Sequence, residues 1–132
     1  MKSNLKEIVQ RYISDIENRK DINELVQFYH PEIEQIEFPN ILLKNKTIRK
    51  LNDIKEAYVK GKAVLQNEKY RIMNSFISEN TVVIEVEWIG VLSIPIGNKQ
   101  IGDEIKAHFA QFFEFESGLI KKQRNYDCFE QF

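Results

Sequence analysis

The segment with the clearest capacity for chemistry covers residues 118–129, near the end of the 132-residue chain. Alternate side chains of a β-strand lie on the same face. Gln123, Asn125 and Asp127 therefore share one face of a predicted strand, as two amides and a carboxylate. If this face meets water, the pattern indicates no function. If it lines a cavity, a buried carboxylate beside two hydrogen-bonding amides is typical of a site for acid/base chemistry.

Tyr12 is the second candidate for chemistry. It lies on the apolar stripe of a predicted helix, whose members are three and four residues apart: Leu5, Ile8, Val9, Tyr12, Ile13 and Ile16. A phenol on such a stripe usually packs in the core with its hydroxyl group satisfied, but it can also offer a proton donor to a buried ligand. The helical spacing favours packing and leaves the donor role open.

Three amphipathic helices and five strands are predicted to position these residues. The helices cover residues 5–16, 22–29 and 47–65. Pro31 ends the second helix, because the residue before a proline is disfavoured in a helix. A short strand at residues 32–38 precedes Pro39. Four longer strands rich in Val, Ile, Phe and Tyr follow, at residues 70–77, 81–94, 104–115 and 119–129.

The four longer strands are predicted to form an antiparallel meander that twists and curls under the helices. The inner face of this sheet is apolar and aromatic, with Gln111 as a polar exception. Its other members on the two central strands are Val82, Ile84, Val86, Trp88, Ala107, Phe109, Phe113 and Phe115. The outer face carries charged residues suited to cross-strand pairing, namely Glu85, Glu87, Lys106, His108 and Arg124.

The composition is that of one globular domain spanning residues 1–132, long enough to bury a core without a metal or a disulfide. With 19 basic and 20 acidic residues and no basic cluster, the chain is not expected to bind nucleic acid or a membrane surface. The single cysteine, Cys128, favours a reducing, cytoplasmic setting. Residues 1–4 lead into a charged helix rather than an apolar signal segment.

No metal or other cofactor is predicted. The two histidines, His30 and His108, lie far apart in the sequence and on elements of different kinds. No glycine-rich phosphate-binding loop precedes a helix. The expected partners are therefore a small molecule and a second copy of the chain.

Four local segments carry a resemblance to a known family: residues 21–29, 87–90, 113–120 and 124–127. Together with the order of the predicted elements, they resemble the nuclear transport factor 2-like superfamily over nearly the whole chain. The closing segment resembles the SnoaL-like and ketosteroid isomerase-like branches. The resemblance implies an α+β fold with cystatin-like topology, in which three N-terminal helices wrap a cone-shaped, curved antiparallel sheet into a barrel-like shape around a pocket. The superfamily hosts isomerases, cyclases, epoxide hydrolases, dehydratases and proteins without catalysis, so this fold does not fix a reaction.

The ketosteroid isomerase pattern implies that the face with Asp127 lines the pocket. The phenol donor of that pattern matches Tyr12, and its second oxyanion acid matches Gln111. Its general base should stand immediately before the proline that ends the first strand, where this chain has Phe38. Steroid isomerisation by that mechanism is therefore not expected.

The expected pocket has apolar walls and one carboxylate. Its ligand-binding residues are Gln111, Gln123, Asn125, Phe38, Val86, Trp88, Phe109 and Phe113. Asp127 resembles the single acid of SnoaL-like cyclases and is expected to act as the acid/base, with Tyr12 as the donor to a ligand oxygen. An epoxide hydrolase would need an arginine and two aspartates, which are not evident, since Glu85 and Glu87 fall on the outer face.

Two functions remain open from the sequence. The first is an enzyme of the isomerase, cyclase or dehydratase type that performs acid/base chemistry on a small, mostly apolar carbonyl or aromatic ligand. The second is a non-catalytic ligand-binding or dimerisation module, in which the same polar residues satisfy one another or hold water. Under either function, the outer sheet face indicates a homodimer.

Overall fold

The computed structural model describes residues 4–132, and the predicted lack of a signal segment falls largely on residues 1–3, outside this range. The elements are α1 (Leu5–Glu17), α2 (Ile22–Leu25), the 3-10 helix η2 (Val26–Phe28), β1 (Tyr29–Glu37), β2 (Thr47–Arg49), α3 (Leu51–Val64), β3 (Leu65–Ser78), β4 (Thr81–Leu92), β5 (Glu104–Glu116) and β6 (Leu119–Phe129). The predicted order of three helices and long C-terminal strands is confirmed, and the structure adds β2.

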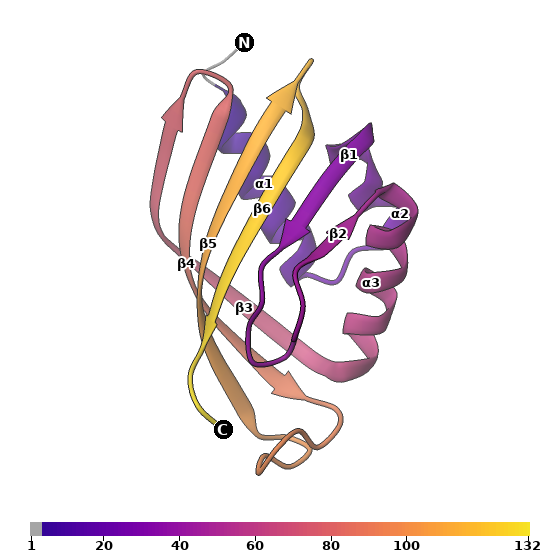
Figure 1. Cartoon of the computed structure of the whole chain (residues 1–132), viewed down its shortest axis with the longest axis vertical. Coiled ribbons are helices and arrows are strands. Elements are labelled where there is room, and N and C mark those ends of the chain that lie inside the picture. The colour runs from indigo at the N-terminus through magenta and orange to yellow at the C-terminus, as the bar shows by residue number, and fades with distance from the viewer. Residues whose placement is uncertain (1–3) are drawn as a thin grey trace.

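All six strands join one curved sheet in the order β2-β1-β6-β5-β4-β3 (Figure 1). The strands from β3 to β6 form the predicted antiparallel meander. β1 instead lies parallel to β6, with Glu37 opposite Asn125. The sheet therefore contains one parallel strand pair in addition to the antiparallel pairs that were predicted. The sheet is not closed into a barrel, because β2 and β3 form its two edges.

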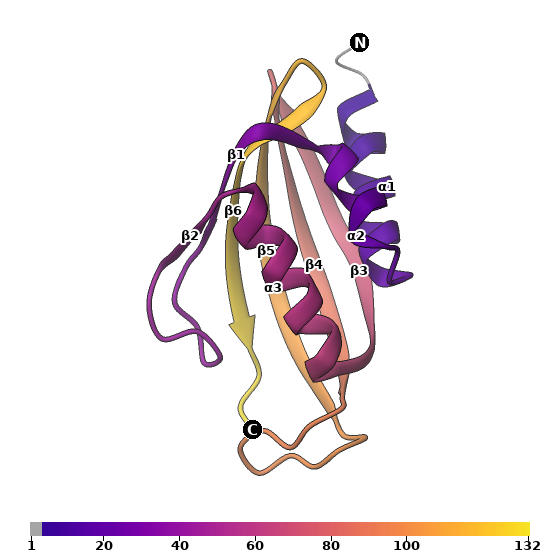
Figure 2. The same ribbon diagram turned by 90° about the vertical axis from the view of Figure 1, so that its right-hand side faces the viewer.

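The helices lie on the concave side of this sheet (Figure 2). α1 packs against β3 and β4, whereas α3 reaches from β1 to β3. The apolar core between α1 and the sheet contains fully buried side chains such as Val9 and Phe113. The predicted α+β architecture, with helices over a curved sheet, is therefore confirmed. No helix within residues 4–132 is long and apolar enough to span a membrane.

The second predicted helix ends earlier than expected. α2 covers four residues, a 3-10 turn follows, and β1 already begins at Tyr29. Tyr29 pairs with Ile120 of β6, and the register shifts just after this pair. Proline is tolerated at such an irregularity, so Pro31 lies within β1 instead of ending a helix.

The third predicted helix begins later than expected. Thr47 belongs to β2, which pairs with β1 so that Ile48 lies opposite Ile36. α3 follows Lys50, whose backbone N–H donates to the Asp53 carboxylate at 2.9 Å. A strand of three residues is too short to show a hydrophobic period, so tertiary pairing decides its conformation.

The turn after α1 contains a residue with a left-handed backbone. The N–H of Arg19 donates to the Ile16 carbonyl at 3.0 Å, and Arg19 has a φ of 57°. Glycine or asparagine usually occupies this position, because a larger side chain disfavours the left-handed region. The chain thus places an arginine where the backbone favours glycine.

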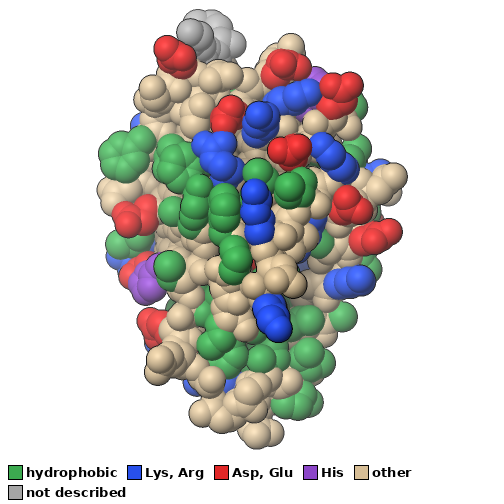
Figure 3. All heavy atoms as spheres, viewed as in Figure 1, with side chains coloured by type: hydrophobic (Ala, Val, Ile, Leu, Met, Phe, Trp, Pro, Cys, Tyr) green, Lys and Arg blue, Asp and Glu red, His purple; other side chains and the backbone are tan. Residues whose placement is uncertain are grey.

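The outer face of the sheet mixes apolar and charged side chains (Figure 3). Glu85, Glu87 and His108 lie on it, as predicted. Glu87 lies 3.5 Å from Arg71, and His108 lies 3.7 Å from a glutamate beyond the end of β6. Large exposed hydrophobic residues on this face include Phe76 and Tyr126.

Candidate functional site

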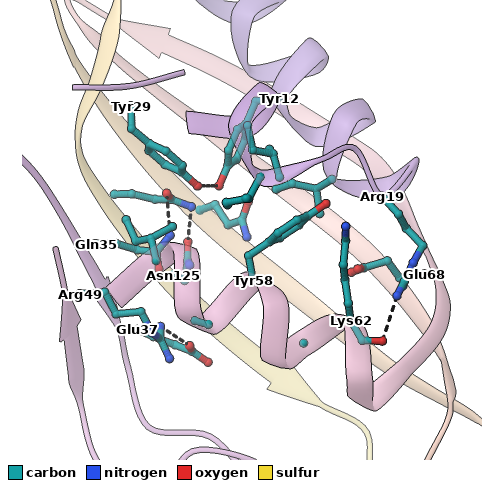
Figure 4. A pocket seen from close by; sticks show the side chains of 18 of the residues that line it. Tyr12, Arg19, Tyr29, Gln35, Glu37, Arg49, Tyr58, Lys62, Glu68 and Asn125 are labelled. Atoms are coloured by element: carbon teal, nitrogen blue, oxygen red, sulfur yellow. Dashed lines mark hydrogen bonds and ion pairs between the residues drawn. The ribbon is translucent and has the colours of Figure 1, made fainter. Parts of the chain in front are cut away.

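A cavity of about 290 Å³ lies between the helices and the concave face of the sheet (Figure 4). Both the helices and the inner face of the sheet contribute to its wall. The polar lining residues include Tyr12, Tyr29, Gln35, Glu37, Arg49, Gln111, Gln123 and Asn125. The wall is therefore much more polar than the predicted apolar pocket.

Two buried tyrosines meet at this wall. Tyr12 from α1 and Tyr29 from the start of β1 share a hydrogen bond, with 2.5 Å between their hydroxyl oxygens. Burial raises the pKa of Tyr12 to about 12 and raises the pKa of Tyr29 well above its ordinary value. Both phenols therefore stay protonated at neutral pH and act as hydrogen-bond donors rather than bases.

Side-chain amides form a relay across β1 and β6. The Nε2 group of Gln35 donates to Oε1 of Gln123 at 3.0 Å, and Nε2 of Gln123 donates to Oδ1 of Asn125 at 3.1 Å. Gln35 lies opposite Gln123 in the parallel strand pair, which brings both side chains to one face. The relay uses the Asn125 oxygen as its acceptor and leaves the Asn125 N–H groups as donors for a ligand.

A cluster of ionisable groups occupies one end of the cavity. Glu37 and Arg49 form an ion pair there, with 2.8 Å between Oε1 and Nη1. Asp127 lies two residues beyond Asn125 on the same face of β6. Burial raises the pKa of Asp127 to about 7, the negative charge of Glu37 adds to the rise, and the positive charge of Arg49 opposes it. A carboxyl group that titrates near neutral pH is suited to work as a general acid or base.

Substitutions of Glu37 and Arg49 are expected to move the pKa of Asp127 in opposite directions. Glu37→Gln removes a negative charge and lowers the pKa, whereas Arg49→Gln removes a positive charge and raises it. The shifts can be followed by NMR at the Asp127 carboxyl carbon. Glu85→Gln, on the outer face, is the matched control and should leave the titration unchanged. Shifts of the same sign in both cavity variants would contradict this assignment.

The raised pKa of Asp127 is also expected to make folding stability depend on pH. The folded chain holds this proton up to about pH 7, whereas the unfolded chain releases it at acidic pH. The stability from this group is therefore complete at acidic pH and is lost as the pH rises through about 7. Each pKa unit corresponds to about 1.4 kcal/mol, so Asp127→Asn should gain stability relative to the native chain as the pH rises. Urea unfolding at a series of pH values measures this difference, and a constant value would oppose the prediction.

The opposite end of the cavity holds a second charged group, formed by Arg19, Lys62 and Glu68 (Figure 4). Nη2 of Arg19 donates to the backbone carbonyl of Lys62 at 3.0 Å, which joins the end of α1 to α3. Oε1 of Glu68 accepts from Nε1 of Trp88 at 2.9 Å. The cavity therefore has charged groups at both ends and neutral donors between them.

Unpartnered polar atoms gather at this cavity. Within residues 4–132, three buried side-chain atoms lack a hydrogen-bond partner: Arg19 Nη1, Gln111 Oε1 and Asp127 Oδ1. Arg19 and Gln111 line the cavity, and Asp127 lies on the same face of β6 as the lining residue Asn125. Since buried polar groups are nearly always paired, the unpartnered atoms of Arg19 and Gln111 are available to a ligand in the cavity.

The structure brings most of the predicted polar site residues together. Tyr12, Gln111, Gln123 and Asn125 all line the cavity. Asp127 is not among the lining residues, but the charges of two of them, Glu37 and Arg49, shift its pKa. The predicted amide and carboxylate face of β6 therefore does turn toward the concave side.

Phe38 lies on the other side of the sheet from the cavity. The parallel register sets Glu37 opposite Asn125, so Glu37 faces the cavity and Phe38 faces outward. The Phe38 ring stacks on Tyr126, with 4.5 Å between the ring centroids. The prediction that Phe38 forms part of the pocket wall is wrong, and a carboxylate faces the cavity from the preceding position.

The other apolar residues predicted for the wall belong to the core. Val86, Trp88, Phe109 and Phe113 are buried on the inner face, and none of them lines the cavity. Trp88 and Phe109 stack with 5.4 Å between centroids. Packing of these side chains in the core fills this part of the concave face, so the cavity lies nearer β1, α3 and the start of β3.

Glu37 and Arg49 line the cavity although neither is predicted as a site residue from the sequence. The sequence does contain a pattern that indicates Glu37. Gln35 and Glu37 are two residues apart and share one face of the first strand, as Gln123 and Asn125 do in the last strand. Arg49 carries no comparable signal, because it lies in the three-residue β2 and meets Glu37 only through strand pairing.

Comparison with known proteins identifies one family. The profile of a family described as SnoaL-like domain matches residues 9–123. No curated protein matches the chain.

Several solved structures share the fold at low sequence identity. IdmH, a candidate polyketide cyclase from Streptomyces antibioticus, has a TM-score of 0.78 at 11% identity, covering 93% of this chain and 91% of that one. A candidate SnoaL-like polyketide cyclase from Jannaschia sp. CCS1 has a TM-score of 0.77 at 12% identity, covering 95% and 85%. TerC, co-crystallised with polyporic acid, has a TM-score of 0.69 at 16% identity, covering 96% and 91%. At these identities the likeness shows the fold alone.

Proposed function

Because the chain belongs to the SnoaL-like domain family, within the nuclear transport factor 2-like superfamily, we propose that it is a cyclase- or isomerase-type enzyme that moves protons on a small carbonyl or aromatic ligand. The observation that carries this proposal is a largely buried carboxyl group, Asp127, whose pKa is raised to about 7 by burial, next to a cavity that contains neutral hydrogen-bond donors. Such a base can accept a proton from carbon while the donors hold the oxygen that becomes negative. The candidate cyclases of the same fold support this class of chemistry.

In the proposed reaction, ionised Asp127 removes a proton from the carbon next to a ligand carbonyl. Tyr12 donates a hydrogen bond to the carbonyl oxygen as the enolate forms, and Tyr29 donates to Tyr12 and fixes its orientation. Asn125 and Gln111 orient the ligand through their amide groups. Return of the proton from Asp127 to a different atom completes an isomerisation. Alternatively, the enolate carbon attacks a second carbonyl carbon of the ligand and closes a ring, and the alkoxide formed from that C=O bond takes the proton back from Asp127.

The polar wall also revises the expected ligand. With a volume of about 290 Å³ and charged groups at both ends, the cavity suits a small ligand that carries several oxygen atoms. We therefore propose an oxygen-rich ligand in place of the mostly apolar one expected from the sequence. The aromatic residues that suggested an apolar ligand pack in the core instead.

Hydrogen–deuterium exchange tests the proposed proton transfer before any product is known. A panel of small aryl ketones and dicarbonyl compounds is incubated with the protein in D₂O, and loss of the α-proton signals is followed by NMR. We expect exchange above the buffer rate for at least one compound, and its loss in Asp127→Asn. Asp103→Asn, an exposed aspartate in the β4–β5 connection, is the matched control and should exchange at the native rate.

Binding without exchange would support the alternative function. If ligands bind with equal affinity to the native chain and to Asp127→Asn, and neither protein accelerates exchange, the chain is a non-catalytic ligand-binding module. Titration of Asp127 at an ordinary acidic pKa would remove the observation on which the enzyme proposal depends.

A second candidate function, hydrolysis of an epoxide, is favoured by one observation. Contrary to the expectation from sequence, the fold does bring an arginine and two carboxylates together, as Arg49, Glu37 and Asp127. Such a group can activate water at one carbon and protonate the leaving oxygen. Incubation of small epoxides in ¹⁸O-labelled water separates the two candidates, because hydrolysis places the label in a diol whereas proton transfer does not.

The outer sheet face supports a proposal of homodimerisation. Exposed Phe76 and Tyr126 lie among charged residues on this face, as expected of a self-complementary interface. Light scattering should give twice the chain mass for the native protein and the single mass for Phe76→Glu. A native protein that is monomeric at micromolar concentration would contradict the proposal.

A further inference from the structure

Two cations stand together at the end of the cavity opposite Glu37 and Arg49. Arg19 comes from the turn after α1, and Lys62 comes from the last turn of α3 (Figure 4). The hydrogen bond of 3.0 Å from Nη2 of Arg19 to the Lys62 carbonyl holds the guanidinium beside this residue. Nζ of Lys62 lies 4.8 Å from the centroid of the Tyr58 ring, another lining residue.

Neither cation has an anionic partner within residues 4–132, where no carboxylate forms an ion pair with Arg19 or Lys62. Nη1 of Arg19 is buried and has no hydrogen-bond partner in the same range. Leaving a charged donor buried without an acceptor is unfavourable, so this group is set up to receive an oxygen atom from outside the chain.

The backbone at Arg19 provides a second, independent observation. Its φ of 57° lies in the left-handed region, where glycine is favoured. Such a conformation is uncommon outside glycine, and here it occurs at the wall of the cavity, at the residue whose guanidinium carries the unpartnered donor.

We propose that Arg19 and Lys62 bind the carboxylate group of a small organic acid. This inference rests on the proposed function and specifies its substrate class: a carbonyl or aromatic acid with its carboxylate at this end and its reactive oxygen at Tyr12. Glu68, held by the Trp88 N–H at 2.9 Å, lines the same end, so two positive charges and one negative charge leave one positive charge. That balance suits a monoanion better than a dianionic phosphate. The planar guanidinium matches a carboxylate in geometry.

Benzoate and its uncharged analogue benzamide provide the test, because they differ in charge and hardly in shape. We expect the native protein to bind benzoate at least about tenfold more tightly than benzamide, measured by calorimetry. Amide NMR shifts should locate both probes at residues of the cavity. High salt should weaken benzoate binding and leave benzamide binding unchanged.

Four variants show whether the two named cations are responsible. Arg19→Gly and Lys62→Gln should each reduce the preference for benzoate to about twofold or less, and glycine adopts the backbone conformation at position 19 without strain. Arg71→Gln on the outer face and Lys60→Gln on the exposed side of α3 are the matched controls and should keep the preference. Equal affinity for the two probes in the native protein, or a preference that survives both cavity variants, would overturn the inference.

The same measurements separate this inference from the proposed function. Asp127→Asn should keep the preference for benzoate, because Asp127 lies with Glu37 and Arg49 at the other end of the cavity. If benzoate is preferred but no ketone exchanges its proton, the carboxylate site stands and the enzyme proposal fails. If exchange depends on Asp127 but benzoate is not preferred, the enzyme proposal stands and the carboxylate site fails.

Discussion

Asp127→Asn is expected to lower the rate of proton exchange by about 10²–10⁴-fold, the usual contribution of a general base. The asparagine keeps the size of the side chain but cannot accept the proton. In the native protein, the rate should rise with pH and level off above about 7, because Asp127 must be ionised to act as the base. The measurement is the exchange rate per enzyme molecule across the pH range, for the best compound of the ketone panel.

The pH dependence of the exchange rate also identifies which residue acts as the base. In Asp127→Asn the inflection near pH 7 should disappear from the residual rate. In Glu37→Gln the inflection should move to lower pH, since the neighbouring negative charge is gone. A native profile without an inflection near neutral pH, or an unchanged profile in Asp127→Asn, would assign the base to another residue.

Tyr12→Phe is expected to lower the same rate by about 10²–10³-fold, the usual effect of removing one donor to a developing oxyanion. The phenylalanine fills the same space in the core but leaves the ligand oxygen without its donor. Because the pKa of Tyr12 is raised to about 12, the native residue stays protonated and the loss should be constant across neutral pH. The midpoint of the Asp127 titration should not move.

Two further substitutions separate this donor role from a role in stability. Tyr126→Phe, on the outer face, is the matched control and should keep the native rate. Tyr12→Phe also leaves the buried Tyr29 hydroxyl without its partner, at a cost of about 1–3 kcal/mol in unfolding free energy. Tyr29→Phe leaves the Tyr12 hydroxyl similarly unpaired, but it removes no direct ligand contact and should affect the rate much less. Equal rate losses in both variants would mean that the tyrosine pair acts through stability alone.

The class of fold was accessible from the sequence because its longest elements carry strong periodic patterns. α1 repeats its apolar residues at three and four positions, and β4, β5 and β6 alternate over 11 to 13 residues. Such patterns need no information from elsewhere in the chain. The short elements were the ones missed or misplaced. α2 spans four residues and β2 spans three, and their conformations depend on neighbours distant in sequence.

The polar half of the site could be predicted for the same local reason. Alternation in β6 places Gln123, Asn125 and Asp127 on one face whatever the strand pairs with. The resemblance to a pocket-forming superfamily then indicated that this face is the concave one. The prediction of apolar walls failed because the aromatic side chains of that face pack in the core and do not line the cavity.

The sequence by itself determined which side chains share a face, because that depends on the geometry of a single strand. The tertiary structure decided what each face meets. The parallel pairing of β1 with β6 joins Gln35 to Gln123, 88 positions later, and it turns Glu37 toward the cavity and Phe38 away from it. The charged ends of the cavity likewise require β2 beside β1 and the turn after α1 beside the end of α3. Contacts between such distant segments leave no periodic trace in the sequence.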